Sequence, residues 1–226
     1  MYKAVLFDID GTLVDSNDAH AHSWVQAFAE FGHHVEFERV RPLIGMGGDK
    51  LMPKLSGVYP WSADGKAISA RRGEIFKTVY LPQLKSTRGA HRLLEWLRDE
   101  NLTLLVATSA NADEVEELLR IANGTKLFDA ASTKDDADRS KPDPDIVQAA
   151  LARGGCDPID AIMIGDTPYD IEAAQRAGVG MIALRCGGWW DDGALGGALA
   201  IYDDPEDLLQ QFDLSPFRRP LPARST

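Results

Sequence analysis

The chain has 226 residues, of which 44% are hydrophobic and 26% charged, so it can form a main globular domain with a sizeable insertion. These proportions are ordinary for a globular protein, and neither of them indicates a disordered chain, a fibre or a membrane protein. The chain carries 35 acidic and 24 basic side chains, a net charge of −11, which disfavours binding to nucleic acid or to an anionic membrane surface. An anionic ligand would therefore depend on individually placed cations.

The N-terminal residues and the spacing of the two cysteines favour a reducing cellular compartment. After Met1 the first apolar run extends only from Ala4 to Phe7, far short of a signal peptide or of the ~20 residues that span a bilayer. Cys156 and Cys186 form no closely spaced pair, as expected for two reduced thiols. We expect a cytoplasmic protein with no membrane partner, and the sequence leaves open whether it is a monomer or a homodimer.

Short apolar runs that end in polar or acidic residues alternate with helical patterns along most of the chain. The runs cover residues 4–7, 102–107, 161–164 and 179–184, and they are typical of buried parallel strands. Between them, apolar residues recur at helical spacing, as at Leu93, Leu94 and Leu97. This alternation predicts an α/β fold with a doubly wound parallel sheet, whose ligands bind beyond the carboxyl ends of the strands.

Residues 15–85 interrupt the alternation. Ala21, Trp24, Phe28 and Phe31 share one helical face, and no strand signal follows them. We therefore expect an α-helical cap inserted after the first strand. The predicted division is a core of residues 1–14 and 86–213, a cap of residues 15–85 and a C-terminal tail of residues 214–226.

The first expected strand runs directly into Asp8-Ile9-Asp10-Gly11-Thr12. Residues two apart in an extended chain point the same way, so both carboxylates can converge on one site, while Gly11 lets the backbone turn behind them. Two close carboxylates repel each other unless a cation or a proton intervenes. A capped turn would explain a lone Asp-x-Asp, but the longer motif favours a catalytic site.

The order of four motifs resembles that of the haloacid dehalogenase (HAD) superfamily. The first is the motif at residues 8–12, followed by Thr108-Ser109, Lys141-Pro142 and Gly165-Asp166 with Asp170 one turn later. The helical insertion after the first motif is similar to the cap of the phosphoglycolate phosphatase and β-phosphoglucomutase group. The resemblance implies a Rossmann-like HAD core and a Mg²⁺-dependent phosphatase that hydrolyses a small phosphorylated metabolite through an aspartyl-phosphate intermediate.

The resemblance also implies roles for the acidic residues. Asp8 would attack phosphorus, and Asp10 would act as general acid and then as general base. Asp8, Asp166 and the main-chain carbonyl of Asp10 would hold Mg²⁺, which prefers hard oxygen ligands. Asp170 would orient Lys141 or a metal-bound water rather than bind Mg²⁺ directly.

Three further groups are expected to bind the transferring phosphoryl group. The hydroxyl of Thr108 and the main-chain N–H of Ser109 would donate hydrogen bonds to its oxygens. Lys141 would supply a positive charge, and Pro142 would stiffen the segment that carries it.

Specificity is expected to come from the cap, because the core motifs touch only the phosphoryl group and the metal. In the loop from Gly45 to Lys50, Gly47 would allow close approach to the ligand, and Lys50 could meet an anionic leaving group. For His20, hinge packing is favoured over proton transfer. Arg72 is expected to lie on a solvated helix face.

Other functions remain open at this point. A phosphomutase of the β-phosphoglucomutase kind shares all four motifs, although Gly48 stands where the cap arginine of the mutase aligns. A dehalogenase would lack the second aspartate of the first motif, so Asp10 argues against it. A catalytically inactive HAD-fold binding module is expected to lack one of Asp8, Asp10, Lys141 or Asp166, and all four are present.

Overall fold

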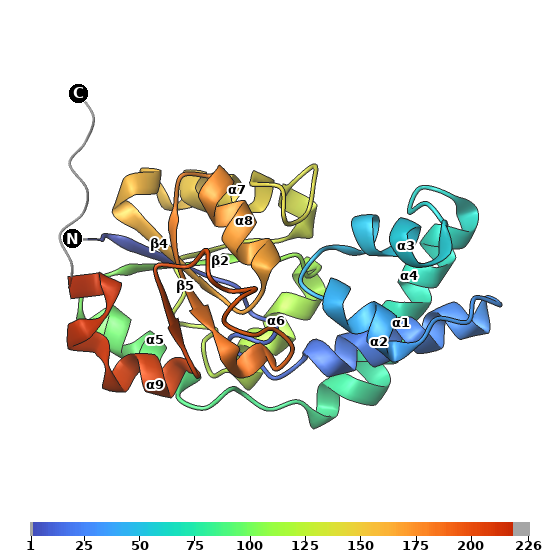
Figure 1. Cartoon of the computed structure of the whole chain (residues 1–226), viewed down its shortest axis with the longest axis horizontal. Helices are drawn as coiled ribbons and strands as arrows, with labels where there is room; N and C mark the ends of the chain where they lie inside the picture. Colours follow the sequence, from blue (N-terminus) through green and yellow to red (C-terminus); the bar gives the residue numbers. More distant parts are fainter. Residues whose placement is uncertain (1, 219–226) are drawn as a thin grey trace.

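The computed structural model describes residues 2–218 and has a six-stranded parallel sheet at its centre (Figure 1). The strands lie in the order β3-β2-β1-β4-β5-β6. Their bounds are β1 Ala4–Phe7, β2 Thr103–Ala107, β3 Ala130–Ser132, β4 Ala161–Gly165, β5 Gly180–Leu184 and β6 Ala200–Tyr202. The predicted doubly wound α/β fold is confirmed.

Helices cover both faces of the sheet. Val5 and Phe7 of β1 pack into one hydrophobic cluster, and Ala4 and Leu6 pack into another on the opposite face. The first cluster includes α5 (Ala90–Asp99), α6 (Ala112–Ile121) and α9 (Pro205–Gln210), and the second includes α7 (Asp145–Gly154) and α8 (Pro168–Arg176). Because both faces are buried, the central strands consist of continuous apolar runs rather than alternating ones.

The four expected strands form within one residue of their expected ends, but the sequence did not indicate β3 and β6. Both are three-residue strands at the edges of the sheet. The sequence of β3 is only Ala130-Ala131-Ser132, which contains no large apolar residue. Strands this short carry no periodic signal and depend on pairing with their neighbours.

The insertion between β1 and β2 is helical. It contains α1 (Asn17–Glu30), α2 (Phe37–Val40), α3 (Gly48–Ser56) and α4 (Ala63–Ile75), followed by a π-helical turn at Phe76–Tyr80. Its own hydrophobic cluster joins Trp24 and Phe28 of α1 to Leu51 and Ile68. Figure 1 shows these helices grouped to one side of the sheet.

The sequence predicted that Phe31 lies on the buried face of α1, and this prediction is wrong. Its side chain is 40% exposed, and it lies one residue beyond the end of the helix. Its backbone has left the helical conformation (φ −102°, ψ 16°), and Gly32 follows with φ +79°. The turn therefore directs Phe31 away from the face that carries Trp24 and Phe28.

The start of the expected C-terminal tail is packed against the core. Ser215, Pro216 and Phe217 are buried, and the ring of Phe217 stacks on Phe212 with 5.1 Å between centroids. Residues 219–226 lie outside the described residues. Within residues 2–218, no helix combines the length and the apolar character needed to cross a membrane.

Candidate active site

Three polar side chains meet at the carboxyl edge of the sheet because they follow three neighbouring strands. β1 lies between β2 and β4, and Phe7 pairs with Val106 and with Ile164. Each strand is followed directly by one of the three residues: β1 by Asp8, β2 by Thr108 and β4 by Asp166. This is the edge at which open α/β sheets bind ligands.

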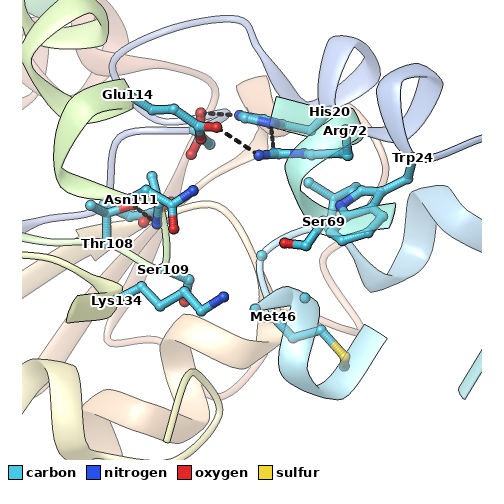
Figure 2. A pocket seen from close by; sticks show the side chains of 17 residues that line it. His20, Trp24, Met46, Ser69, Arg72, Thr108, Ser109, Asn111, Glu114 and Lys134 are labelled. Atoms are coloured by element: carbon cyan, nitrogen blue, oxygen red, sulfur yellow. Dashed lines mark hydrogen bonds and ion pairs between the residues drawn. The ribbon is translucent and has the colours of Figure 1, made fainter. Parts of the chain in front are cut away.

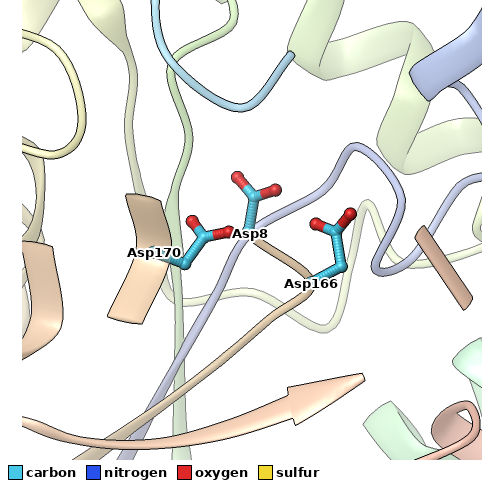
Figure 3. A group of neighbouring side chains, drawn as sticks. All are labelled: Asp8, Asp166 and Asp170. Carbon is cyan, nitrogen blue, oxygen red and sulfur yellow. The ribbon is translucent and has the colours of Figure 1, made fainter. Parts of the chain in front are cut away.

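A cluster of aspartates occupies this edge. Asp8, Asp166 and Asp170 are buried, and one oxygen of each lies within 4.8 Å of the others (Figure 3). The first motif supplies Asp8, the end of β4 supplies Asp166, and the first turn of α8 supplies Asp170. Three carboxylates this close repel one another unless cations or protons compensate their charge.

Lys141 provides part of that compensation. Its Nζ lies 2.6 Å from Oδ1 of Asp8 and 2.7 Å from Oδ1 of Asp170, and its side chain is buried. Burial alone would lower the pKa of Lys141, but Asp170 and Asp8 outweigh burial and raise that pKa. The ammonium group is therefore charged where it touches Asp8.

Asp170 uses its second oxygen to begin α8. Oδ2 accepts hydrogen bonds from the main-chain N–H of Thr167 at 3.1 Å and from its hydroxyl at 2.6 Å, in a capping box. Oδ1 pairs with Lys141. Both oxygens of Asp170 are thus engaged by the protein, which favours the expected role of orienting Lys141.

The charge balance and donor set of the cluster fit a magnesium ion. The pKa of Asp8 is raised to about 7, chiefly by burial, with Asp170 and Asp10 adding to the rise and Lys141 opposing it. Burial likewise raises the pKa of Asp166 well above its ordinary value, with Asp170 and Asp8 adding to the effect. One lysine leaves residual negative charge on buried carboxylate oxygens, which are the ligands that Mg²⁺ prefers.

Asp166 is held in place by two residues that follow β1. Asn17 Nδ2 donates to its Oδ2 at 2.8 Å, and Thr12 Oγ1 donates to its Oδ1 at 3.3 Å. A Cβ at Gly11 would lie 2.1 Å from Asn17 Nδ2 and 2.3 Å from Asp166 Oδ2, and the φ of Gly11 is +74°. Both observations explain why the first motif needs glycine there. No motif in the sequence pointed to Asn17.

Asp10 lies on the side of the site that faces the cap. Its Oδ1 accepts a hydrogen bond from Ser16 Oγ at 2.5 Å and lies 2.7 Å from His20 Nε2. Burial would raise the pKa of Asp10, but His20, Ser16 and Arg72 outweigh burial and lower that pKa. The ring of His20 also stacks on Phe76, 4.1 Å between centroids, so this residue packs at the hinge and touches Asp10.

A cavity lies between the core and the cap, and its walls contain most of the expected site residues (Figure 2). Core residues in its lining include Asp8, Asp10, Thr108 and Ser109. The cap contributes residues 44–48 together with His20, Trp24, Ser69 and Arg72. The hydroxyl of Ser109 is buried without a hydrogen-bond partner in the described part of the chain. The second motif therefore presents a spare donor to this cavity.

The prediction that Arg72 lies on a solvated helix face is wrong. Its side chain is 12% exposed, and Nη1 lies 2.8 Å from Oε1 of Glu114 on α6. Nη2 donates to Nδ1 of His20 (Figure 2). The guanidinium group also lies over the rings of Trp24 and Phe76. A single cap residue thus joins the core, the hinge histidine and the cap. Nothing in the sequence marked Glu114 as its partner.

The loop from Gly45 to Lys50 is only partly placed as expected. Gly47 lines the cavity, and a Cβ there would lie 2.3 Å from Ser140 Oγ, so glycine permits close approach of cap and core. Lys50 does not line this cavity. Its Nζ donates to the carbonyl of Ser140 at 2.6 Å and to Oδ2 of Asp143 at 2.5 Å. The expected contact of Lys50 with a leaving group is therefore replaced by a contact with the core.

Comparisons with known proteins agree with this geometry. Residues 5–184 match the model of the haloacid dehalogenase-like hydrolase family. The chain is 30% identical over 187 residues to validoxylamine A 7'-phosphate phosphatase of Streptomyces hygroscopicus subsp. limoneus, covering 81% of this chain and 86% of the relative. It is 28% identical over 209 residues to the phosphorylated carbohydrates phosphatase of Thermotoga maritima, covering 92% and 96%.

A solved structure extends the likeness to three dimensions. The crystal structure of a hydrolase from Pseudomonas syringae superposes with a TM-score of 0.86 at 32% identity, covering 94% of this chain and 98% of that one. The family match spans the sheet from β1 to β5, the whole cap and all four motifs. The chain is a member of the haloacid dehalogenase-like hydrolase family.

Proposed function

We propose that the protein is a Mg²⁺-dependent phosphatase that hydrolyses a small phosphorylated metabolite, with Asp8 as the nucleophile. The observation that carries the proposal is the position of Asp8. Its buried carboxylate contacts Lys141, belongs to the same cluster as Asp166 and lines the cavity beneath the cap. The relatives described as phosphatases support the same chemistry.

The residues that would hold Mg²⁺ are Asp8, Asp166 and the main-chain carbonyl of Asp10. The ion would supply positive charge to the phosphoryl oxygens and offset the repulsion between these carboxylates and the substrate. Asn17 and Thr12 fix the orientation of Asp166 for this role.

Asp8 is assigned the attack on phosphorus. An oxygen of its carboxylate forms a bond to phosphorus while the bond to the ester oxygen breaks, which gives an aspartyl phosphate and a free alcohol. Lys141 holds the Asp8 carboxylate in position and supplies charge beside the transferring group. Thr108 and Ser109, at the cavity wall, are assigned hydrogen bonds to the phosphoryl oxygens.

Asp10 is assigned the proton transfers. Its proton passes to the departing ester oxygen, and the resulting carboxylate then takes a proton from the water that hydrolyses the aspartyl phosphate. The negative charge of a bound phosphate group favours the protonated form that the first transfer needs. Hydrogen bonds from Ser16 and His20 hold one oxygen of Asp10, which aims the carboxyl group at the cavity.

The test combines turnover with trapping of the intermediate. Purified protein should release inorganic phosphate from p-nitrophenyl phosphate only when Mg²⁺ is present. Acid quenching after mixing with ³²P-labelled acetyl phosphate should leave label on the wild-type protein and none on Asp8→Asn. Labelling of Asp8→Asn at the wild-type level would contradict the assignment of Asp8.

The same preparation separates a phosphatase from a phosphomutase. A phosphatase should convert β-glucose 1-phosphate to glucose and inorganic phosphate. A mutase should instead produce glucose 6-phosphate, with a sugar bisphosphate required to start the cycle. At the position of the aligned mutase arginine, a Cβ on Gly48 would lie 2.8 Å from the ring of Trp24, so this site has little room for a longer side chain.

A further inference from the structure

The active-site cavity continues outward into a second hollow between α4 of the cap and α6 of the core. We call this hollow the outer groove, and its charged lining residues are Lys66, Glu74, Lys77, Asp113, Glu114 and Lys134. Ser69, Asn111, Glu114 and Lys134 line both the cavity and the outer groove. These four residues therefore surround the passage through which a leaving group longer than the cavity would extend.

Every acidic side chain of the outer groove already has a basic partner. Glu114 pairs with Arg72 at 2.8 Å, Glu74 pairs with Arg71 at 3.0 Å, and Asp113 pairs with Lys77. The pairing removes most of the negative charge that these residues would otherwise present to a ligand.

Two lysines of the outer groove have no such partner. Within residues 2–218, the part of the chain that the structure describes, no ion pair joins Lys134 or Lys66 to an acidic residue. In a chain with a net charge of −11, the passage thus has unpaired positive charge and no unpaired acid. That balance suits an anionic ligand and opposes a cationic one.

Lys134 is placed where it can act on the substrate. It begins a short 3₁₀ turn after β3, and its main-chain N–H is fixed by a hydrogen bond to the carbonyl of Ala110 at 3.0 Å. Figure 2 shows its side chain extending from the core, beside Ser109, toward the cap loop that carries Met46. Of the basic residues in the cavity lining, Arg72 is occupied by Glu114 and His20, which leaves Lys134 available.

We propose that Lys134 determines specificity by binding a second anionic group, a carboxylate, on the leaving group of the phosphomonoester. This inference rests on the proposed phosphatase function and names the class of substrate. The phosphoryl group to be transferred lies at Asp8, and the second anionic group lies at the passage beside Ser69 and Asn111. Lys66 adds positive charge farther out along the outer groove.

Two pairs of substrates test the proposal, because the members of each pair differ only in one terminal group. 6-Phosphogluconate and sorbitol 6-phosphate form the long pair, and 3-phosphoglycerate and glycerol 3-phosphate form the short pair. In each pair a carboxylate replaces a hydroxymethyl group. Wild-type protein with Mg²⁺ should have the higher kcat/KM for the carboxylate member of at least one pair.

Removing the lysine should erase that preference. Lys134→Ala should lower kcat/KM for the preferred carboxylate substrate by about ten- to a hundredfold, mainly through KM, because a charge-assisted contact to the leaving group contributes to uniform binding. The neutral member should lose much less. Lys134→Arg should retain the preference, and Lys134→Glu should invert it.

Lys126→Ala is the matched control, since Lys126 is an exposed lysine that lines neither the cavity nor the outer groove. It should leave the ratio between the two members of each pair unchanged. An unchanged ratio in Lys134→Ala, or no preference in the wild type, would overturn the role of Lys134 while leaving the phosphatase function intact. No phosphate release from any of the four compounds or from p-nitrophenyl phosphate would instead contradict the proposed function itself.

Discussion

His20 Nε2 lies 2.7 Å from Oδ1 of Asp10, while Nδ1 of the same ring accepts a hydrogen bond from Arg72. A guanidinium group can only donate, so Nδ1 must be an acceptor and the ring proton must lie on Nε2. His20 therefore donates to Asp10 through Nε2 in this arrangement. Because Arg72 is itself anchored by Glu114, the core and the cap together fix the orientation of the proposed acid.

Replacing the histidine should therefore affect the proton transfer more than the phosphoryl transfer. His20→Phe keeps a ring against Phe76 but removes the donor to Asp10. We expect kcat/KM for alkyl phosphates, whose leaving groups need a proton, to fall by about a hundredfold, and that for aryl phosphates to fall far less. Steady-state kinetics over a series of leaving groups measures this difference. Equal losses for both classes would show that His20 acts only in packing.

Removing Lys141 while its two aspartate partners remain should lower the free energy of unfolding. Lys141→Met leaves Asp8 and Asp170 buried without their cation, and we expect the free energy of unfolding to fall by about 3 to 5 kcal/mol. Adding Asp8→Asn should recover part of that loss, since the amide removes one of the two uncompensated charges. Urea unfolding of the two single variants and the double variant measures the coupling. Strictly additive losses would show that the two groups do not stabilise each other.

Magnesium binding can be measured without turnover. An ion that binds the native protein and not the unfolded chain raises Tm, so the wild type should be stabilised by Mg²⁺ and lose this effect with EDTA. Asp166→Asn should bind the ion much more weakly and show little Mg²⁺-dependent shift. Asp160→Asn is a control, because Asp160 immediately precedes β4, at the opposite end of the strand from Asp166, and pairs with Lys3. An undiminished shift in Asp166→Asn would exclude Asp166 as a ligand.

The sequence was sufficient to predict the central sheet and the residues that follow its strands. β1, β2 and β4 are buried on both faces, so their sequences are continuous apolar runs that a parallel sheet requires. The polar residues after them had to meet, because these strands are neighbours. Edge strand β3 lacked such a run, and Lys134, which follows it, was therefore not identified.

The contacts between cap and core could not be predicted from the sequence. Arg72 and Glu114 are separated by 42 residues, and each alone has the spacing of an ordinary helix-surface charge. Their burial results from the packing of α4 of the cap close to α6 of the core, which local periodicity does not encode. The same limit applies to Lys50, whose partner Asp143 is 93 residues away.

Replacing Lys50 should affect all substrates alike, in contrast to the selective loss expected for Lys134→Ala. Its ammonium group is engaged by Asp143 and by the carbonyl of Ser140, and its side chain is 24% exposed. Lys50→Ala should weaken the docking of the cap by about 1 kcal/mol, the upper range for such a pair near the surface. Closure of the cap serves every substrate alike, so kcat/KM for all four test compounds should fall by a similar factor, about fivefold or less. Asp143→Asn, which removes the partner from the core side, should produce the same uniform loss. Steady-state kinetics of both variants with the long and short substrate pairs checks this, and a selective loss of the carboxylate substrates in Lys50→Ala alone would place Lys50 back among the specificity residues.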